Sequence, residues 1–264
     1  MKKIIMSVLL SALVFTSCKK EETTTTTSTP GTPSSAQVQL ATATTSNNET
    51  VVLYADHNDL STGYENLYVT LKDASGNAMT GATVEYLPMM DMGTMQHSCP
   101  TEQPTYNSSM AKYKGAVVFV MSSMGGTWTL EVKVNGSPVT FTLTVAESAT
   151  KVMGMYTGTD GSKYVVSLLK PVIWSVGMND VEFLLHKRVS GLDWPAVTDF
   201  TMVMTPEMTS MNHGSANNID PVHIGNGHYN GDVNYTMTGD WRLHLQLLQN
   251  GTEIQADAFL DILF

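Results

Sequence analysis

Cysteine is almost absent from this chain, which has two among 264 residues, Cys18 and Cys99. Cys18 ends an apolar N-terminal segment, so Cys99 is the only thiol in everything that follows it. An intramolecular disulfide is therefore excluded from the part of the chain after Cys18. We expect the fold to depend on its hydrophobic core rather than on covalent cross-links.

Charge is also scarce, since Asp, Glu, Lys and Arg make up 14% of the residues. The 14 basic residues face 24 acidic ones, and without Lys2 and Lys3 the balance becomes 12 − 24 = −12. An acidic chain of this kind has no electrostatic means of holding nucleic-acid phosphates or anionic lipid. We expect no nucleic-acid partner.

Motifs of catalysis are missing as well. The sequence has no Gly-x-Ser-x-Gly elbow, no His-Glu-x-x-His, no phosphate-binding glycine loop and no convincing pair of carboxylates. This favours a protein that is not an enzyme.

Long apolar runs are limited to one, from Ile4 to Phe15, which is too short to cross a bilayer. It follows two lysines, as in a secretory signal. The segment VFTSC at 14–18 resembles a bacterial lipobox, and the following KKEE at 19–22 resembles a charged tract that directs lipoproteins to the outer membrane. The resemblance implies a signal peptide at 1–17, a lipid on Cys18 that attaches the protein to the membrane, and an envelope location facing the periplasm or the cell surface.

Composition then divides the remainder of the chain. Residues 18–47 are rich in Thr, Ser and Pro and have almost nothing to bury, which predicts a disordered tether. Two units of ordinary domain size follow, at 48–147 and 148–264.

Both units alternate apolar and polar residues between turn signals, and no stretch has a helical period. In the first unit we expect strands at 51–54, 64–72, 82–87, 116–121, 127–134 and 139–145. In the second we expect strands at 164–169, 181–187, 200–204, 231–237, 242–249 and 253–260. Asn135-Gly136 and Asn250-Gly251 predict hairpin turns because both residue types tolerate positive φ. The fold class is therefore all-β, as two tandem immunoglobulin-like β-sandwiches.

One pattern occurs twice. Met92-Gly93-Thr94-Met95-Gln96-His97 shares the spacing Met-x-x-Met-x-His with Met208-Thr209-Ser210-Met211-Asn212-His213. Each histidine is followed by a Tyr-x-Gly, a methionine (Met121 or Met237) and a Gly-x-Trp. A repeat of this length indicates one structural unit used twice.

A family resemblance rests on several of these segments. They are DASGNAMTGATV at 73–84, the Met-rich segment, YKG at 113–115 and MGGTWTLEV at 124–132. Together they resemble a YtkA-like/FixH-like domain, and the second unit is a more divergent copy. The resemblance implies a small secreted β-sandwich associated with copper handling or with assembly of copper-containing oxidases.

The repeated soft donors predict a metal. Thioethers favour Cu(I), and a Met/His set without a carboxylate cluster favours copper over zinc or calcium. In an extended segment residues i and i+2 share a side, so Met95 with His97, and Met211 with His213, are expected to converge. The predicted ligands are Met92, Met95, His97 and Met121 in the first unit, and Met208, Met211, His213 and Met237 in the second.

Three further side chains are possible additional ligands: Cys99, His223 and His228. Cys99 has no counterpart in the repeat, and the two histidines are equally consistent with solvated positions. Met121 and Met237 are as consistent with the core as with a metal, whereas Met202 and Met204 are expected in the core.

Two alternatives to copper buffering, sensing or transfer remain open. Methionine is a flexible core filler and a soft protein-binding surface, so the chain is also consistent with a structural or adhesive module that needs no metal. The family resemblance adds a role as accessory factor in oxidase assembly. A copper protein of this kind would have a copper donor or acceptor protein as its partner.

Overall fold

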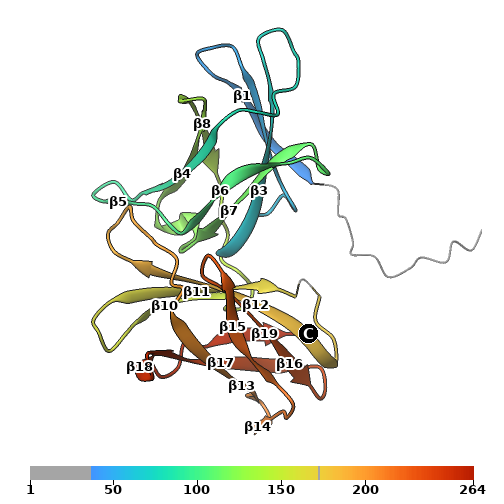
Figure 1. Ribbon diagram of the computed structural model, residues 1–264, viewed down its shortest axis with the longest axis vertical. Helices are drawn as coiled ribbons and strands as arrows, with labels where there is room; N and C mark the ends of the chain where they lie inside the picture. The colour runs from blue at the N-terminus through green and yellow to red at the C-terminus, as the bar shows by residue number, and fades with distance from the viewer. Residues whose placement is uncertain (1–36, 172) are drawn as a thin grey trace, which may run out of the picture. The chain divides into compact units, whose positions relative to one another are not determined.

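The computed structural model describes residues 37–171 and 173–264. The predicted signal peptide, Cys18 with its predicted lipid, and most of the predicted tether lie outside these residues. The described part is all-β, as expected, with a single turn of 3-10 helix (Figure 1). No helix in it is long and apolar enough to cross a membrane.

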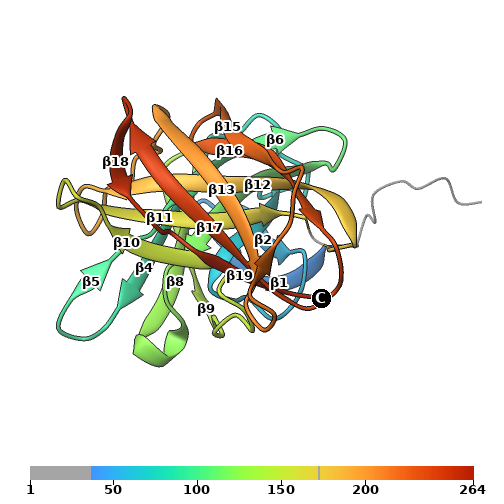
Figure 2. The ribbon, with the colours of Figure 1, turned by 90° about the horizontal axis from the view of Figure 1, so that it is seen from below.

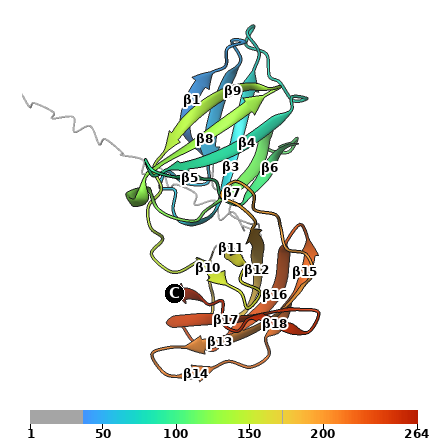
Figure 3. The same ribbon diagram turned by 90° about the vertical axis from the view of Figure 1, so that its left-hand side faces the viewer.

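The first sandwich packs a five-stranded sheet, ordered β1-β2-β3-β7-β6, on a four-stranded sheet, ordered β5-β4-β8-β9 (Figure 3). Its elements are β1 (Val38–Thr44), β2 (Thr50–Ala55), β3 (Gly63–Lys72), β4 (Val84–Asp91), β5 (Gln96–His97), β6 (Thr101–Asn107), β7 (Lys112–Phe119), η1 (Ser123–Gly125), β8 (Thr127–Val134) and β9 (Ser137–Leu143).

The second sandwich repeats this plan with sheets β10-β11-β12-β16-β15 and β14-β13-β17-β18, and β19 also pairs with β17 (Figure 2). Its strands are β10 (Met153–Thr157), β11 (Lys163–Lys170), β12 (Gly177–Arg188), β13 (Phe200–Met208), β14 (His213–Gly214), β15 (Ile219–Gly225), β16 (His228–Tyr235), β17 (Asp240–Gln249), β18 (Thr252–Gln255) and β19 (Leu260–Leu263).

The two sandwiches share the same order of strands apart from one edge, which confirms the tandem immunoglobulin-like architecture. The difference lies at this edge. In the first sandwich β9 pairs along β8, whereas in the second sandwich two short strands, β18 and β19, pair along β17, the counterpart of β8. The predicted strand at 253–260 is therefore wrong in detail, because residues 256–259 interrupt it.

The alternation of the sequence places each core. Along β8 every second residue is buried, from Trp128 to Val134, and β17 does the same from Trp241 to Leu247. The buried side chains form one cluster per sandwich. A third, small cluster of Val118, Val165, Leu184 and Trp194 joins the two.

The predicted hairpins are confirmed. Asn135 and Gly136 have φ of +49° and +87°, and Asn250 and Gly251 have +50° and +78°. A third turn of this kind, Asn226-Gly227, connects β15 to β16 and was not predicted.

The start of the first sandwich differs from the prediction. Strand β1 (Val38–Thr44) lies inside the segment assigned to the tether and pairs along β2. This strand is short and weakly apolar, and its register shifts between Gln39 and Ala41. Leu40, Ala41 and Ala43 are only partly buried against the core. A lone edge strand with so little to bury resembles a tether in composition.

The tyrosines of the repeated Tyr-x-Gly have a structural role. The hydroxyl of Tyr113 accepts a hydrogen bond from the Ala82 amide (2.8 Å) and donates to the Met79 carbonyl (3.2 Å). Tyr229 does the same with the Phe200 amide (3.2 Å) and the Val197 carbonyl (3.1 Å). Each therefore fastens the loop that leads into β4 or β13.

Candidate metal site

The Met-rich repeat of the first sandwich is a tight hairpin between β4 and β5. The carboxylate of Asp91 accepts hydrogen bonds from the Gly93 amide (2.8 Å) and from Nε2 of Gln96 (3.1 Å), and Gly93 has φ +80°. The turn places the predicted ligands Met92 and Met95 at its exposed tip. Met95 is 56% exposed while His97 is 8% exposed, so the two side chains lie in different environments.

His97 instead belongs to a row of inward-facing residues. Across the sheet it pairs with Met90 of β4, which in turn pairs with Trp128 of β8. The His97 ring meets the Trp128 indole edge to face, with centroids 5.7 Å apart and planes at 88°. The imidazole is therefore held by packing as well as by its own hydrogen bonds.

The two ring nitrogens of His97 have different neighbours. Nδ1 lies 2.8 Å from the carbonyl oxygen of Ser98, which can only accept, so Nδ1 carries a proton. Nε2 lies 3.2 Å from Sδ of Met121. In the neutral imidazole Nε2 then turns its lone pair towards the thioether, so both atoms are available as donors to a proton or another cation. A carbonyl on the remote nitrogen is also the usual way in which a metal-ligating histidine is oriented.

Met121 is positioned from two sides. Its carbonyl accepts a hydrogen bond from Nε1 of Trp128 (2.8 Å). Gly125 leaves room for its side chain, because a Cβ at this position would lie 2.7 Å from Cε of Met121. The prediction left Met121 between core and ligand, and the structure places it, half-buried, at the edge of the core and against His97.

The second sandwich has a looser version of this arrangement. Nδ1 of His213 lies 3.0 Å from the carbonyl oxygen of Gly214, and its ring meets Trp241 edge to face at 5.5 Å. The carbonyl of Met237 accepts from Nε1 of Trp241 (3.0 Å). His213 lines an open cavity of about 260 Å³, and no contact between its Nε2 and Met237 closes the site.

The remaining two predicted ligands of this copy are separated from each other. Met208 is buried at the end of β13, across from Trp241, and Met211 is exposed in the turn that follows. Met208, predicted as a ligand, therefore belongs to strand β13 and to the core of the second sandwich. The reason is a hairpin shorter by two residues: 97 − 90 = 7 positions lead from Met90 to its paired histidine, and 213 − 208 = 5 lead from Met208.

The possible additional ligands are engaged elsewhere. Cys99 is buried in the first core, where desolvation raises the pKa of its thiol well above the usual range. Nε2 of His223 accepts a hydrogen bond from the Gly227 amide (3.2 Å). Both nitrogens of His228 lie against carboxylates, Glu102 and Glu182.

The histidines without a pattern have polar partners or are buried. His57 pairs with Glu65 (3.2 Å), and His244 lies between Glu207 and Asp257 (both 2.9 Å). His186 is buried between the two sandwiches, and this burial lowers its pKa to about 4. Sequence reasoning missed the groups around His186 and His228, because their partners are on strands far apart in the chain.

The donor chemistry of the described residues distinguishes between metals. In residues 37–171 and 173–264 no three His, Cys, Asp or Glu side chains are arranged to hold an ion. The donors brought together, an imidazole and a thioether, are neutral and soft, which suits Cu(I) and not a hard cation such as calcium.

Comparison with known proteins leaves the family open. No family model and no curated protein matches the chain. Among solved structures, an Escherichia coli adhesin, FdeC, is similar at 17% identity over 85% of this chain, with a TM-score of 0.27. Invasin, a bacterial integrin-binding protein, is similar at 13% over 76% (TM-score 0.28). A conserved domain protein from Bacillus anthracis is similar at 12% over 87% of this chain and 91% of its own (TM-score 0.31).

This chain spans 66% of the FdeC chain and 43% of the invasin chain. Likeness at such identities concerns the fold alone, and TM-scores of this size carry no argument about function.

Proposed function

We propose that this protein binds Cu(I) through His97 and Met121 of its first sandwich. The observation that carries the proposal is the 3.2 Å approach of Nε2 of His97 to Sδ of Met121, with the imidazole proton held on the opposite nitrogen by the Ser98 carbonyl. Met92 and Met95, exposed at the adjacent hairpin tip, are the further donors that complete the site. The corresponding site of the second sandwich would use His213 and Met237 and would bind more weakly, because its donors are not in contact.

The same geometry makes the site suitable for exchange. Thioethers need no deprotonation, so acid does not compete at Met121 as it does at a thiolate. The two anchored donors lie beside an exposed tip rather than inside a closed cage. The role that follows is buffering, sensing or transfer of copper by a lipid-anchored protein of the cell envelope, with a copper donor or acceptor protein as partner.

The test is a Cu(I) competition titration against a chromophoric chelator. Residues 37–264 provide a soluble protein that retains β1, which a start at Asn48 would remove. The His97→Gln and Met121→Leu variants should each lose at least about tenfold in affinity for the tighter equivalent. Met124→Leu is the matched control, since this methionine lies three positions from Met121 and is 95% exposed.

Equal affinity in parent and His97→Gln would overturn the assignment of the site. Failure of the parent to compete with the chelator would overturn copper binding itself. His213→Gln separates the two copies: it should remove only the weaker equivalent, and the tighter one should be unchanged.

A second function, as an interaction module without metal, is favoured by a different observation. The edge strand β15 exposes Ile219, Val222 and Ile224, with Val222 64% exposed, whereas β6, its counterpart in the first sandwich, has the polar sequence TEQPTYN. An exposed apolar edge strand is a surface on which another strand can pair. The oxidase-assembly role stays a prediction of the family resemblance.

This second function is tested by association. If β15 pairs with the β15 of another copy, sedimentation should show a dimer that Val222→Lys abolishes and Thr105→Lys, on the corresponding polar edge strand β6, does not. A parent that is monomeric at millimolar concentration would reject pairing between copies.

A further inference from the structure

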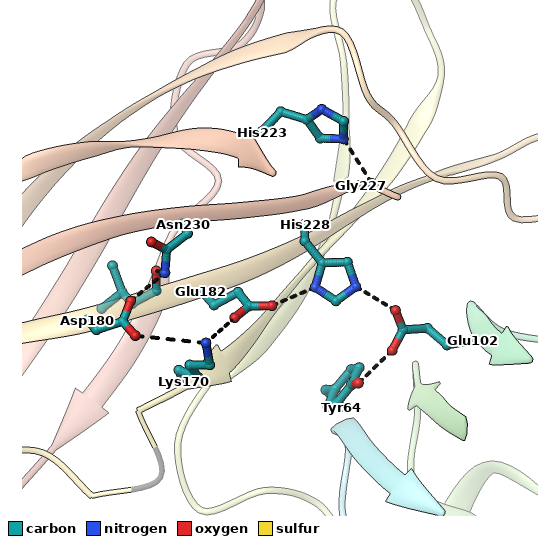
Figure 4. A network of polar contacts seen from close by, with 10 residues as sticks. Tyr64, Glu102, Lys170, Asp180, Glu182, His223, Gly227, His228 and Asn230 are labelled. Atoms are coloured by element: carbon teal, nitrogen blue, oxygen red, sulfur yellow. Dashed lines mark hydrogen bonds and ion pairs between the residues drawn. The ribbon is translucent and has the colours of Figure 1, made fainter. Parts of the chain in front are cut away.

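The contact between the two sandwiches contains a histidine clamped by two carboxylates (Figure 4). His228, on β16 of the second sandwich, has Nε2 2.5 Å from Oε1 of Glu102 on β6 of the first. Its Nδ1 lies 2.6 Å from Oε1 of Glu182 on the adjacent strand β12. One imidazole ring therefore spans the junction.

With both carboxylates ionised, only the protonated ring satisfies both contacts. A neutral imidazole has one donor and one acceptor nitrogen, whereas the imidazolium has two donors. Without the second proton, a nitrogen lone pair would face a carboxylate oxygen at 2.5 or 2.6 Å, and one partly buried carboxylate would lose its partner. Between two ionised carboxylates this geometry requires His228 to be imidazolium.

The other oxygens of both carboxylates are already engaged. Oε2 of Glu102 accepts from the hydroxyl of Tyr64 (2.6 Å), and Oε2 of Glu182 pairs with Nζ of Lys170 (2.6 Å). Lys170 also lies 3.8 Å from Asp180. Because these second oxygens already have partners, neither carboxylate can turn away from a neutral His228 without losing another contact.

The rest of the junction is mainly apolar. Its buried apolar cluster has four members, and Nε1 of Trp194, one of them, has no hydrogen-bond partner. The buried hydroxyl of Ser167, on β11 of the same sheet, is unpartnered as well. Tyr64 and Val120 of the first sandwich and Met153 and Leu169 of the second pack against this cluster. One backbone hydrogen bond, from the Ser98 amide to the Gly191 carbonyl (2.7 Å), also joins the two sandwiches. Relative motion of two domains is the general expectation unless their interface is large and hydrophobic.

We propose that His228 is a proton-operated latch, which holds the two sandwiches together while it is charged and releases them when it loses its proton. The inference is independent of copper, because no residue of the latch belongs to the proposed metal site. The latch would make the attachment of the two sandwiches to each other depend on pH.

The direction of the response follows from the charges. Hydrogen bonding to Glu102 and Glu182 raises the pKa of His228 above its ordinary 6.5, against the opposing effect of burial. Burial acts to raise the pKa of Glu102, but hydrogen bonds from His228 and Tyr64 outweigh it and hold this pKa below 4.5. The neutral His186 beside them, with a pKa near 4, charges only in acid and then repels His228.

These shifts define the pH range in which the latch is closed. A histidine with a raised pKa stabilises the junction fully when the pH is below its ordinary pKa, and this stabilisation is lost as the pH rises through the raised pKa. A carboxyl group with a lowered pKa stabilises the junction when the pH is above its ordinary pKa, and this stabilisation is lost as the pH falls through the lowered pKa. The latch is thus closed from below pH 4.5 to above pH 6.5 and opens on the alkaline side.

The test is NMR on residues 37–264. Backbone ¹⁵N relaxation should give the two sandwiches one common correlation time at pH 6, and two separate, shorter ones above the pKa of His228. His228→Gln should show the separated behaviour at both pH values. His244→Gln is the matched control, since His244 is also clamped by two carboxylates but both, Glu207 and Asp257, belong to its own sandwich.

A second variant covers the case in which His228→Gln does not fold. Glu102→Gln removes one acceptor from an edge strand, so the ring-proton titration of His228 should move to lower pH and the sandwiches should tumble separately at pH 6. A common correlation time that persists through the titration of His228, or an unmoved titration in Glu102→Gln, would overturn the latch.

Discussion

Met90 and Met208 occupy the same place in the two sandwiches. Each is buried. On one neighbouring strand its cross-strand partner is the tryptophan of its sandwich, and on the other neighbouring strand it is the histidine of its sandwich. The equivalence of Met90 and Met208 follows from their positions in the strands, since Pro88 and Pro206 precede them by two residues. It does not follow from the Met-x-x-Met-x-His spacing. These two methionines therefore belong to the core beneath the proposed sites.

Truncation of either should be costly. Met90→Ala and Met208→Ala each leave a cavity beside a buried indole, and buried methionine-to-alanine changes cost about 2–5 kcal/mol. Met124→Ala, at an exposed position of η1, should stay within about 0.5 kcal/mol of the parent. Urea unfolding curves measure all three, and a small loss for Met208→Ala would show that this residue is not core.

The glycines of the repeated Tyr-x-Gly give a second prediction. A Cβ at Gly115 would lie 2.7 Å from the carbonyl oxygen of Glu102, and one at Gly231 would lie 2.5 Å from that of Ile219. Both obstacles are backbone of the adjacent edge strand, which cannot rotate away. Gly115→Ala and Gly231→Ala should therefore destabilise by about 1–3 kcal/mol, as overpacking does.

Gly81→Ala is the control for that pair. No atom lies within 4 Å of a Cβ at Gly81, and its φ is not positive. Thermal unfolding should place this variant at or above the parent. If all three alanine variants unfolded alike, close packing of β6 and β15 would not be the reason for the repeated glycine.

Much of the fold followed from short-range chemistry. Alternation located the central strands, and Asn-Gly pairs located two hairpins, because each depends on residues adjacent in the chain. The edge strands β1, β6 and β15 were missed because an edge buries little and alternates weakly. The strand β13 extends to Met208, beyond the predicted end at residue 204.

The candidate site was predictable only in part. The repeat identified His97, Met121, His213 and Met237 as equivalent pairs, and the structure confirms the equivalence through the two tryptophan N–H groups. Which methionine approaches which histidine depends on strand register, and a difference of two residues in hairpin length displaced the second set. The carboxylates around His228 come from separate sandwiches, so no local pattern contains them.

Cys99 should be chemically silent in the folded protein. The thiolate is the reactive form, and burial both shields this thiol and raises its pKa. Alkylation of residues 37–264 by iodoacetamide should be slow in buffer and rapid in urea, with one label per chain. Fast labelling of the folded protein at neutral pH would place Cys99 at the surface and return it to the set of possible ligands.

Copper binding at His97 should be detected in the second sandwich. Ser98 accepts from Nδ1 of His97 through its carbonyl and donates through its amide to the carbonyl of Gly191, so one residue connects the imidazole to the loop between β12 and β13. A metal on Nε2 polarises the ring and strengthens the Nδ1–H donor. Addition of Cu(I) to ¹⁵N-labelled protein should therefore shift the amide of Leu192, whose peptide unit contains that carbonyl. The shift should be absent in His97→Gln and present in His213→Gln. A shift that persists in His97→Gln would mean that the loop responds to a different metal site.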